Sequence, residues 1–303
     1  YLSSAFSATA YLPLSQRLPF AAALRLRKGA IGRESPAGGR SFWYPTHRAL
    51  KRAARAAAQA RGKETHVIGR YTRPEMGRIW ELENKFAIWK EIEVLACEAQ
   101  AELGQAGITR EEAQWIRDHA DFTVEEIDEI EKVTNHDVIA FTTCMANYID
   151  ADIPEGGDKP SRWVHYGMTS SDLGDTALSY QVTQACDIII EDIKRLGETC
   201  KRRAFEFQNT LCVGRTHGIH AEPMTFGMKF GSWAWALKRA LTRMEQARAV
   251  AATGAISGAV GTYSSIDPYV EQYVCEKMGL TPDPLSTQVL ARDRHAQVMA
   301  ALA

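Results

Sequence analysis

The residues best suited to chemistry in this sequence are histidines that stand in polar, loop-like settings beside expected helix starts. Histidine changes its charge near neutral pH, which makes it the usual proton carrier in catalysis. Three of the eight histidines have such a setting: His136, His165 and His217. Taken singly, each is more often a structural, hydrogen-bonded histidine than a catalytic one, so the neighbouring residues must decide.

The segment from Gly214 to Pro223 carries the densest group of such side chains. It contains two histidines, an arginine and a glutamate, namely Arg215, His217, His220 and Glu222. Because proline suits the first turn of a helix, we expect a turn-like segment with the next helix starting at Pro223. The His-x-x-His spacing lacks a sensibly placed third ligand for zinc, so acid–base work is the better interpretation and no metal is expected.

A second candidate is the run of hydroxyl groups between Met168 and Asp172, ahead of an expected long helix. Free N–H groups and the helix dipole favour an anion at a helix N-terminus, so a carboxylate or a phosphate would fit. An ordinary helix cap made by Ser170, Ser171 or Asp172 explains the same residues equally well.

The elements that must position these residues are helical. Pro74 suits the first turn of a helix, and apolar residues recur every three or four positions from Ile79 to Leu103, which predicts one long amphipathic helix that ends near residues 104–107. Capping-box patterns predict short helices after Thr109 and Thr123. A further helix is expected over residues 137–149.

Longer helices are expected beyond an exposed loop at residues 152–160. They should cover residues 172–208 and 223–252, followed by a flexible glycine-rich connection. Asp267 and Pro268 should begin another helix, and a last one should begin near Ser286. No alternating strand pattern of useful length occurs. The predicted fold class is therefore all-α, with a small helical N-terminal domain (67–168) and an incomplete long-helix bundle (169–303).

Residues 1–66 differ in composition from the rest of the chain. They hold twelve Lys or Arg residues and two acidic ones, which leaves a net charge of about −11 on the remainder. A targeting peptide could have this composition, but a disordered or non-native extension is the simpler interpretation. The acidic body argues against nucleic-acid binding, and the lack of a run of eighteen apolar residues argues against a membrane span. Six scattered cysteines fit reduced thiols in the cytoplasm.

Four motifs, taken in order, resemble those of the bacterial adenylosuccinate lyases, which belong to the fumarase/aspartase superfamily. They lie at residues 70–76, 135–138, 163–170 and 214–223. The resemblance covers essentially residues 67–303. It implies a cytoplasmic, cofactor-free homotetramer of long helices whose active sites combine segments of three subunits. The implied reactions eliminate fumarate from adenylosuccinate, giving AMP, and from the succinyl-aminoimidazole carboxamide ribotide, giving the carboxamide ribotide.

The resemblance also implies roles for individual residues. His217 would be the general acid that protonates the departing nitrogen, oriented by Thr216. His165 would lie near the phosphate or the leaving group. The remaining members of the implied substrate site are Arg70, Tyr71, Asn135, His136, Asp137, Thr169, Ser170 and Gln288, with His136 also counted among the catalytic residues. The roles of His220 and Glu222 stay open.

One departure from the superfamily pattern concerns the catalytic base. A segment of the Ser-Ser-x-Met-Pro-x-Lys-x-Asn type, which supplies the serine that removes the Cβ proton, does not occur in residues 1–303. We therefore expect these residues alone to be inactive. Two alternatives remain: another lyase of the superfamily, such as argininosuccinate lyase, fumarase or aspartase, and a catalytically silent helical assembly protein.

Overall fold

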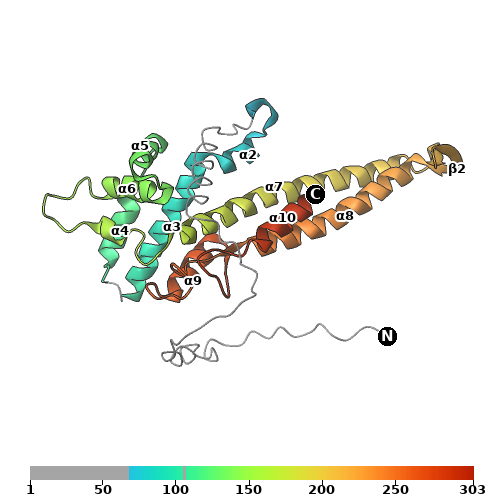
Figure 1. Ribbon diagram of the computed structural model, residues 1–303. Coiled ribbons are helices and arrows are strands. Elements are labelled where there is room, and N and C mark those ends of the chain that lie inside the picture. The colour runs from blue at the N-terminus through green and yellow to red at the C-terminus, as the bar shows by residue number, and fades with distance from the viewer. Residues whose placement is uncertain (1–67, 105–106) are drawn as a thin grey trace, which may run out of the picture. The chain divides into compact units, whose positions relative to one another are not determined.

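Helices account for most of the computed structural model, which describes residues 68–104 and 107–303 (Figure 1). The predicted all-α class is confirmed. The extension predicted at residues 1–66 lies outside the described residues. Within the described part, no helix is long and apolar enough to cross a membrane. The division of residues 67–303 between residues 168 and 169 stays a prediction.

The first part of the described chain contains short turns and four longer helices. Its elements are η3 (Gly69–Tyr71), α2 (Pro74–Gly77), η4 (Arg78–Trp80), α3 (Leu82–Leu103), α4 (Arg110–His119), α5 (Val124–Thr134), α6 (Asp137–Ile149) and η5 (Pro160–Trp163). The single helix predicted from Pro74 is wrong, because extended backbone at Glu81 separates η4 from α3. The predicted end is confirmed, since Gly104 caps α3 with a φ of 65°.

Side-chain caps set the starts of the following helices. Thr109 and Glu112 form a reciprocal capping box, and the Thr123 hydroxyl accepts the N–H of Glu126. The helix predicted over residues 137–149 has these bounds in the structure. An aromatic core joins α3 to α6, with the Phe86 and Phe141 rings stacked 5.7 Å apart.

Two long helices form the second part of the chain. They are α7 (Ser170–Glu206) and α8 (Phe226–Ala251), which run side by side and carry a hairpin of β1 (Leu211–Thr216) and β2 (Ile219–Thr225) at their far end (Figure 1). The expectation of no strand is thus wrong for this segment. Pro223 pairs with Val213 inside the hairpin, so α8 begins three residues later than predicted.

After α8, the chain returns to the N-terminal half of α7, where its last elements lie. They are β3 (Thr253–Gly254), α9 (Pro268–Met278), β4 (Thr281–Pro282) and α10 (Asp293–Leu302). The Asp267 carboxylate caps α9 as predicted, by accepting the N–H of Tyr269 at 2.9 Å. The helix predicted near Ser286 is wrong: α10 starts at Asp293, because the Leu290 N–H, which a helix starting at Ser286 would use in its first turn, donates to Oδ2 of Asp175 at 2.9 Å.

Candidate functional site

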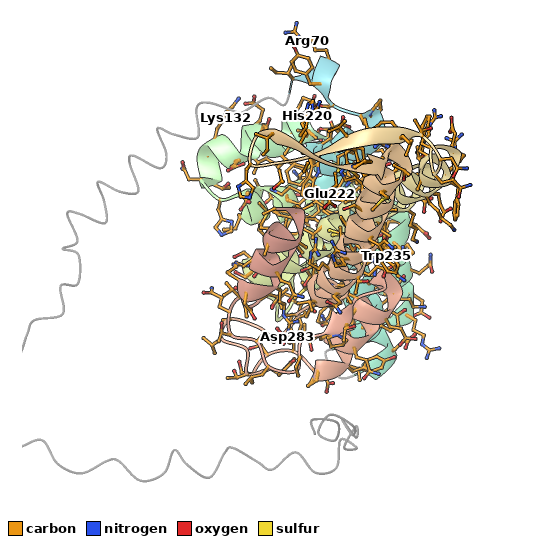
Figure 2. The ribbon with its side chains drawn as sticks, turned by 90° about the vertical axis from the view of Figure 1, so that its right-hand side faces the viewer. Arg70, Lys132, His220, Glu222, Trp235 and Asp283 are labelled. Atoms are coloured by element: carbon orange, nitrogen blue, oxygen red, sulfur yellow. The ribbon has the colours of Figure 1, made fainter. Side chains whose placement is uncertain are left out.

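His217 lies at the tip of the β1–β2 hairpin. Thr216 and Ile219 pair across the two-residue turn His217–Gly218, whose φ values of 51° and 74° are those of a type I′ turn. Figure 2 looks onto this hairpin, with His220 and Glu222 labelled on β2. Both Thr216 and His217 are exposed. The hairpin therefore presents its polar side chains outward from this chain.

The strand partners explain why the hairpin contains Gly214. The pairing register shifts between Val213 and Arg215, and a β-carbon on Gly214 would lie 2.8 Å from the carbonyl oxygen of Glu222. Only glycine allows this approach without a shift of the backbone. The glycine thus shapes the strand that leads to His217.

His165 lies in the turn between η5 and α7, with a φ of 63° that non-glycine residues seldom adopt. Its Nδ1 lies 2.6 Å from Oε1 of Glu93, and its backbone N–H donates to Oε2 of the same carboxylate at 2.8 Å. Burial lowers the pKa of His165, but the hydrogen bond and charge of Glu93 and the charge of Asp172 outweigh it, so the pKa is raised.

Thr169 and Ser170 begin α7, where Thr169 is the N-cap. The cap predicted for Ser170, Ser171 or Asp172 is therefore one residue or more too late. Asp172 instead closes the first turn, since its Oδ2 accepts the backbone N–H of Thr169 at 2.9 Å. Both hydroxyl residues are partly exposed, so the helix N-terminus with its free N–H groups can receive an anion.

Asn135, His136 and Asp137 form the junction between α5 and α6. Asn135 ends α5 in the left-handed conformation, with a φ of 51°. Nδ1 of His136 accepts the N–H of Ile139 at 3.2 Å, so the neutral ring carries its proton on Nε2. The Asp137 side chain is half exposed and lies 3.8 Å from the Lys85 ammonium group.

The remaining predicted site residues are exposed. The Arg70 guanidinium lies 4.8 Å above the Tyr71 ring in η3, and Gln288 lies in the loop before α10. Within the described residues, these three side chains form no hydrogen bond or ion pair with His136, His165 or His217.

The predicted site residues thus fall into separate groups within one chain. The 37 residues of α7 span about 55 Å, and they separate Thr169 and Ser170 from the hairpin that carries His217. His165, Thr169 and Ser170 lie at the N-terminal end of α7. One copy of the chain does not bring His217 to them.

Sequence reasoning missed the buried carboxylate of Glu93 beside this group, and it named Asp172 only as a possible helix cap. Glu93 has no exposed surface, and its place among buried Trp89, Ile92 and Ala96 was the available signal. Asp172 accepts the N–H groups of Ser257 and Gly258 at 3.0 and 3.1 Å. Burial raises the pKa of Asp172, although these hydrogen bonds act to lower it.

No metal centre is found among the described residues: nowhere in 68–104 or 107–303 do three His, Cys, Asp or Glu side chains meet in a way that could hold an ion.

Solved structures share this fold. The chain matches fumarate lyase from Mesorhizobium sp. BNC1 with a TM-score of 0.67 and 24% identity, over 77% of this chain and 55% of that one. It matches 3-carboxy-cis,cis-muconate lactonizing enzyme from Pseudomonas putida with a TM-score of 0.65 and 24% identity, over 77% and 52%. At 24% identity, these two matches show that the chain shares the fold of these long-helix proteins, and they show nothing more.

A protein-family model described as "Lyase" matches residues 69–303, and the chain belongs to this family. It is 52% identical over 237 residues to adenylosuccinate lyase of Bacillus subtilis (strain 168), covering 78% of this chain and 53% of that protein. It is 46% identical over 237 residues to adenylosuccinate lyase of Staphylococcus saprophyticus, with the same coverage. The resemblance predicted from four motifs is confirmed, and the chain spans about half the length of these curated relatives.

Proposed function

We propose that this chain belongs to an adenylosuccinate lyase. It would eliminate fumarate from adenylosuccinate, giving AMP, and from the succinyl-aminoimidazole carboxamide ribotide, giving the carboxamide ribotide. The observation that carries the proposal is an identity of 46–52% to three proteins of that name. The predicted cytoplasmic location and the lack of a cofactor belong to the same proposal.

The residues of the chain fit the proton and charge movements of this elimination. A base takes the Cβ proton, a role that the resemblance gives to a serine outside residues 1–303, and negative charge then builds on a carboxylate before the C–N bond breaks and the nitrogen takes a proton. The imidazole of His217 would donate that proton. Thr169, Ser170 and the first N–H groups of α7 would hold the carboxylates, where preorganised donors stabilise the developing charge.

The separation of these groups supports an assembly with shared sites. His217 and Thr169 lie at opposite ends of α7, so a site that uses both needs more than one copy of the chain. Large apolar side chains near the hairpin are exposed, including Ile219 (64%) and Trp235 (62%). A groove of about 790 Å³ lies between α7 and α8 in the same region. Exposed apolar surface of this kind is typical of a face that another subunit covers.

We therefore propose that the complete protein is a homotetramer. In its active sites, Arg70, Tyr71 and Gln288 would face the nucleotide.

The alternatives differ in substrate or in having no reaction at all. An argininosuccinate lyase, a fumarase or an aspartase would share the fold but act on other substrates. A silent assembly protein would keep the helices and lose nothing when His217 is changed.

The deciding experiment follows the loss of ultraviolet absorbance of adenylosuccinate with the full-length protein. Argininosuccinate and fumarate are tested beside it, and residues 1–303 alone are expected to show no turnover. The His217→Ala variant should lose 100- to 10,000-fold in kcat while it keeps its oligomeric state by light scattering. The His119→Ala variant is the control, because His119 stacks on Trp115 away from the hairpin. No turnover of adenylosuccinate by the intact protein would refute the proposal.

A further inference from the structure

The carboxylate of Glu93 is buried in the apolar core of α3, where an ionised group is costly unless it is paired. Its neighbours Trp89 and Ile92 on the same face are buried too. Both of its oxygens reach one residue: Oε1 reaches the ring nitrogen Nδ1 of His165, and Oε2 its backbone N–H. The cost of burial is therefore met by contacts with His165.

These two contacts fix His165 in both backbone and ring. The left-handed φ of 63° costs energy for a residue with a β-carbon, and it persists only where the surroundings hold it. The hydrogen bond from the backbone N–H to Oε2 holds the peptide, and the contact at Nδ1 holds the ring. About a quarter of the side chain (24%) stays exposed, and Nε2 is the ring nitrogen that Glu93 leaves free.

The charged groups that face the ring are both acidic. They are Glu93 from α3 and Asp172 from the first turn of α7. Two carboxylates favour the charged form of an imidazole, against the opposing effect of burial. The hydroxyl groups of Thr169 and Ser170 follow His165 within five residues, so a cationic ring would add to the attraction of this helix end for an anion.

We propose that Glu93 is a positioning residue that holds His165 as an imidazolium ion, with Nδ1–H toward the core and Nε2–H available to an anionic group of the substrate. The identity of that substrate rests on the proposed function. The charge state of the His165 ring does not, because it depends only on residues of this chain. In this arrangement His165 acts as a fixed charged donor, and proton transfer to the leaving nitrogen stays with His217.

The test is a pH titration of the histidine ring nitrogens by NMR in the 303-residue chain labelled with ¹⁵N-histidine. The His165→Gln variant assigns the resonance. We expect the midpoint of His165 to lie above the ordinary value of 6.5 and to fall measurably in the Glu93→Gln variant. A midpoint at or below 6.5 in the unchanged chain, or one that Glu93→Gln does not move, would overturn the proposal.

A matched control removes a different buried carboxylate. Glu271 is 4% exposed and accepts the backbone N–H of Ile256 at 2.9 Å, and it is not among the charged groups that act on the pKa of His165. The Glu271→Gln variant should leave the midpoint of His165 in place, and circular dichroism shows whether each variant folds. If Glu93→Gln does not fold, Glu93→Asp replaces it and should lower the midpoint by a smaller amount, because the shorter carboxylate cannot make both contacts.

Kinetics of the full-length protein supply a second readout. If His165 binds an anion, Glu93→Gln should raise KM about tenfold and leave kcat within a few-fold. A fall in kcat at unchanged KM would contradict the role as a charged donor. The NMR result stands without turnover, so failure of the proposed reaction and failure of this inference are distinguishable.

Discussion

Replacing Asp172 by asparagine tests how the segment after α8 is held against α7. One buried carboxylate accepts three backbone N–H groups, from Thr169 at 2.9 Å, Ser257 at 3.0 Å and Gly258 at 3.1 Å. The side chain of Asp172 is 2% exposed, so water cannot replace a lost acceptor. The Asp172→Asn variant keeps the shape of the side chain and removes one acceptor oxygen together with the charge.

The expected loss follows from the hydrogen bonds. The amide oxygen can keep one of the two sets of contacts, while the NH2 group faces N–H donors that it cannot satisfy. With the amide oxygen in the place of Oδ2, which accepts two of the three hydrogen bonds, only the bond from Ser257 to Oδ1 is lost, and a hydrogen bond to a charged acceptor is worth about 1.5–3 kcal/mol. Because the neutral amide avoids the desolvation cost of a carboxylate, we expect the lower half of this range, a loss of about 2 kcal/mol in unfolding free energy.

The control is Asp175→Asn, which lies one turn further along α7. Asp175 accepts the N–H of Leu290 at 2.9 Å and pairs with Arg292, whose side chain is 57% exposed. An asparagine keeps the first contact, and although the Asp175 side chain is only 13% exposed, its arginine partner lies mostly in water, so we expect the ion pair to be worth at most about 1 kcal/mol. Urea unfolding measures both variants. A loss below about 1 kcal/mol for Asp172→Asn, or a larger loss for Asp175→Asn, would refute the reasoning.

Two further predictions concern backbone geometry and helix capping. Gly258 and Gly261 both have positive φ (81° and 77°), but only at Gly261 would a β-carbon lie 2.3 Å from a backbone oxygen, that of Ser286. Gly258→Ala should cost about 1–2 kcal/mol and Gly261→Ala at least twice as much, and equal shifts in thermal unfolding would contradict this. Thr109→Ala should cost about 1 kcal/mol in urea unfolding through loss of the cap with Glu112, and an unchanged midpoint would refute it.

The helices were predictable because their signals are local. Apolar spacing and a four-residue capping pattern are read from neighbours in the chain, and they placed the helix over residues 137–149 and the start of α4 correctly. The break before α3 was missed for the same reason. Apolar periodicity continues through η4, and only the extended conformation of Glu81 interrupts the helix.

The hairpin was missed because its strands have little burial to produce an alternating pattern. Most residues of β1 and β2 are exposed, and the sheet has only two strands. The signal that existed is the turn, where His217 is followed by glycine and both adopt positive φ. A histidine tolerates this conformation better than most residues, so the pair serves as a hairpin turn.

Contacts between distant residues set the limit of what the sequence could predict about the site. Glu93 reaches His165 over 72 positions, and Asp172 reaches Ser257 over 85. The sequence around Glu93 or Asp172 does not show which residue is its partner. A carboxylate among apolar residues of a helix indicates only that a partner must exist. The groups around His165 are therefore findings of the structure, whereas the motifs that contain His165 and His217 were visible in the sequence.

The same limit explains why the order of motifs mattered more than any single motif. About 55 Å of α7 separates the hydroxyl groups of Thr169 and Ser170 from the hairpin of His217, so no contact within one chain connects them. Physical reasoning on each group alone gives an anion site at one end and an exposed histidine at the other. Joining them into one reaction requires either the family resemblance or a second copy of the chain, and both lead to the same expectation of sites shared between subunits.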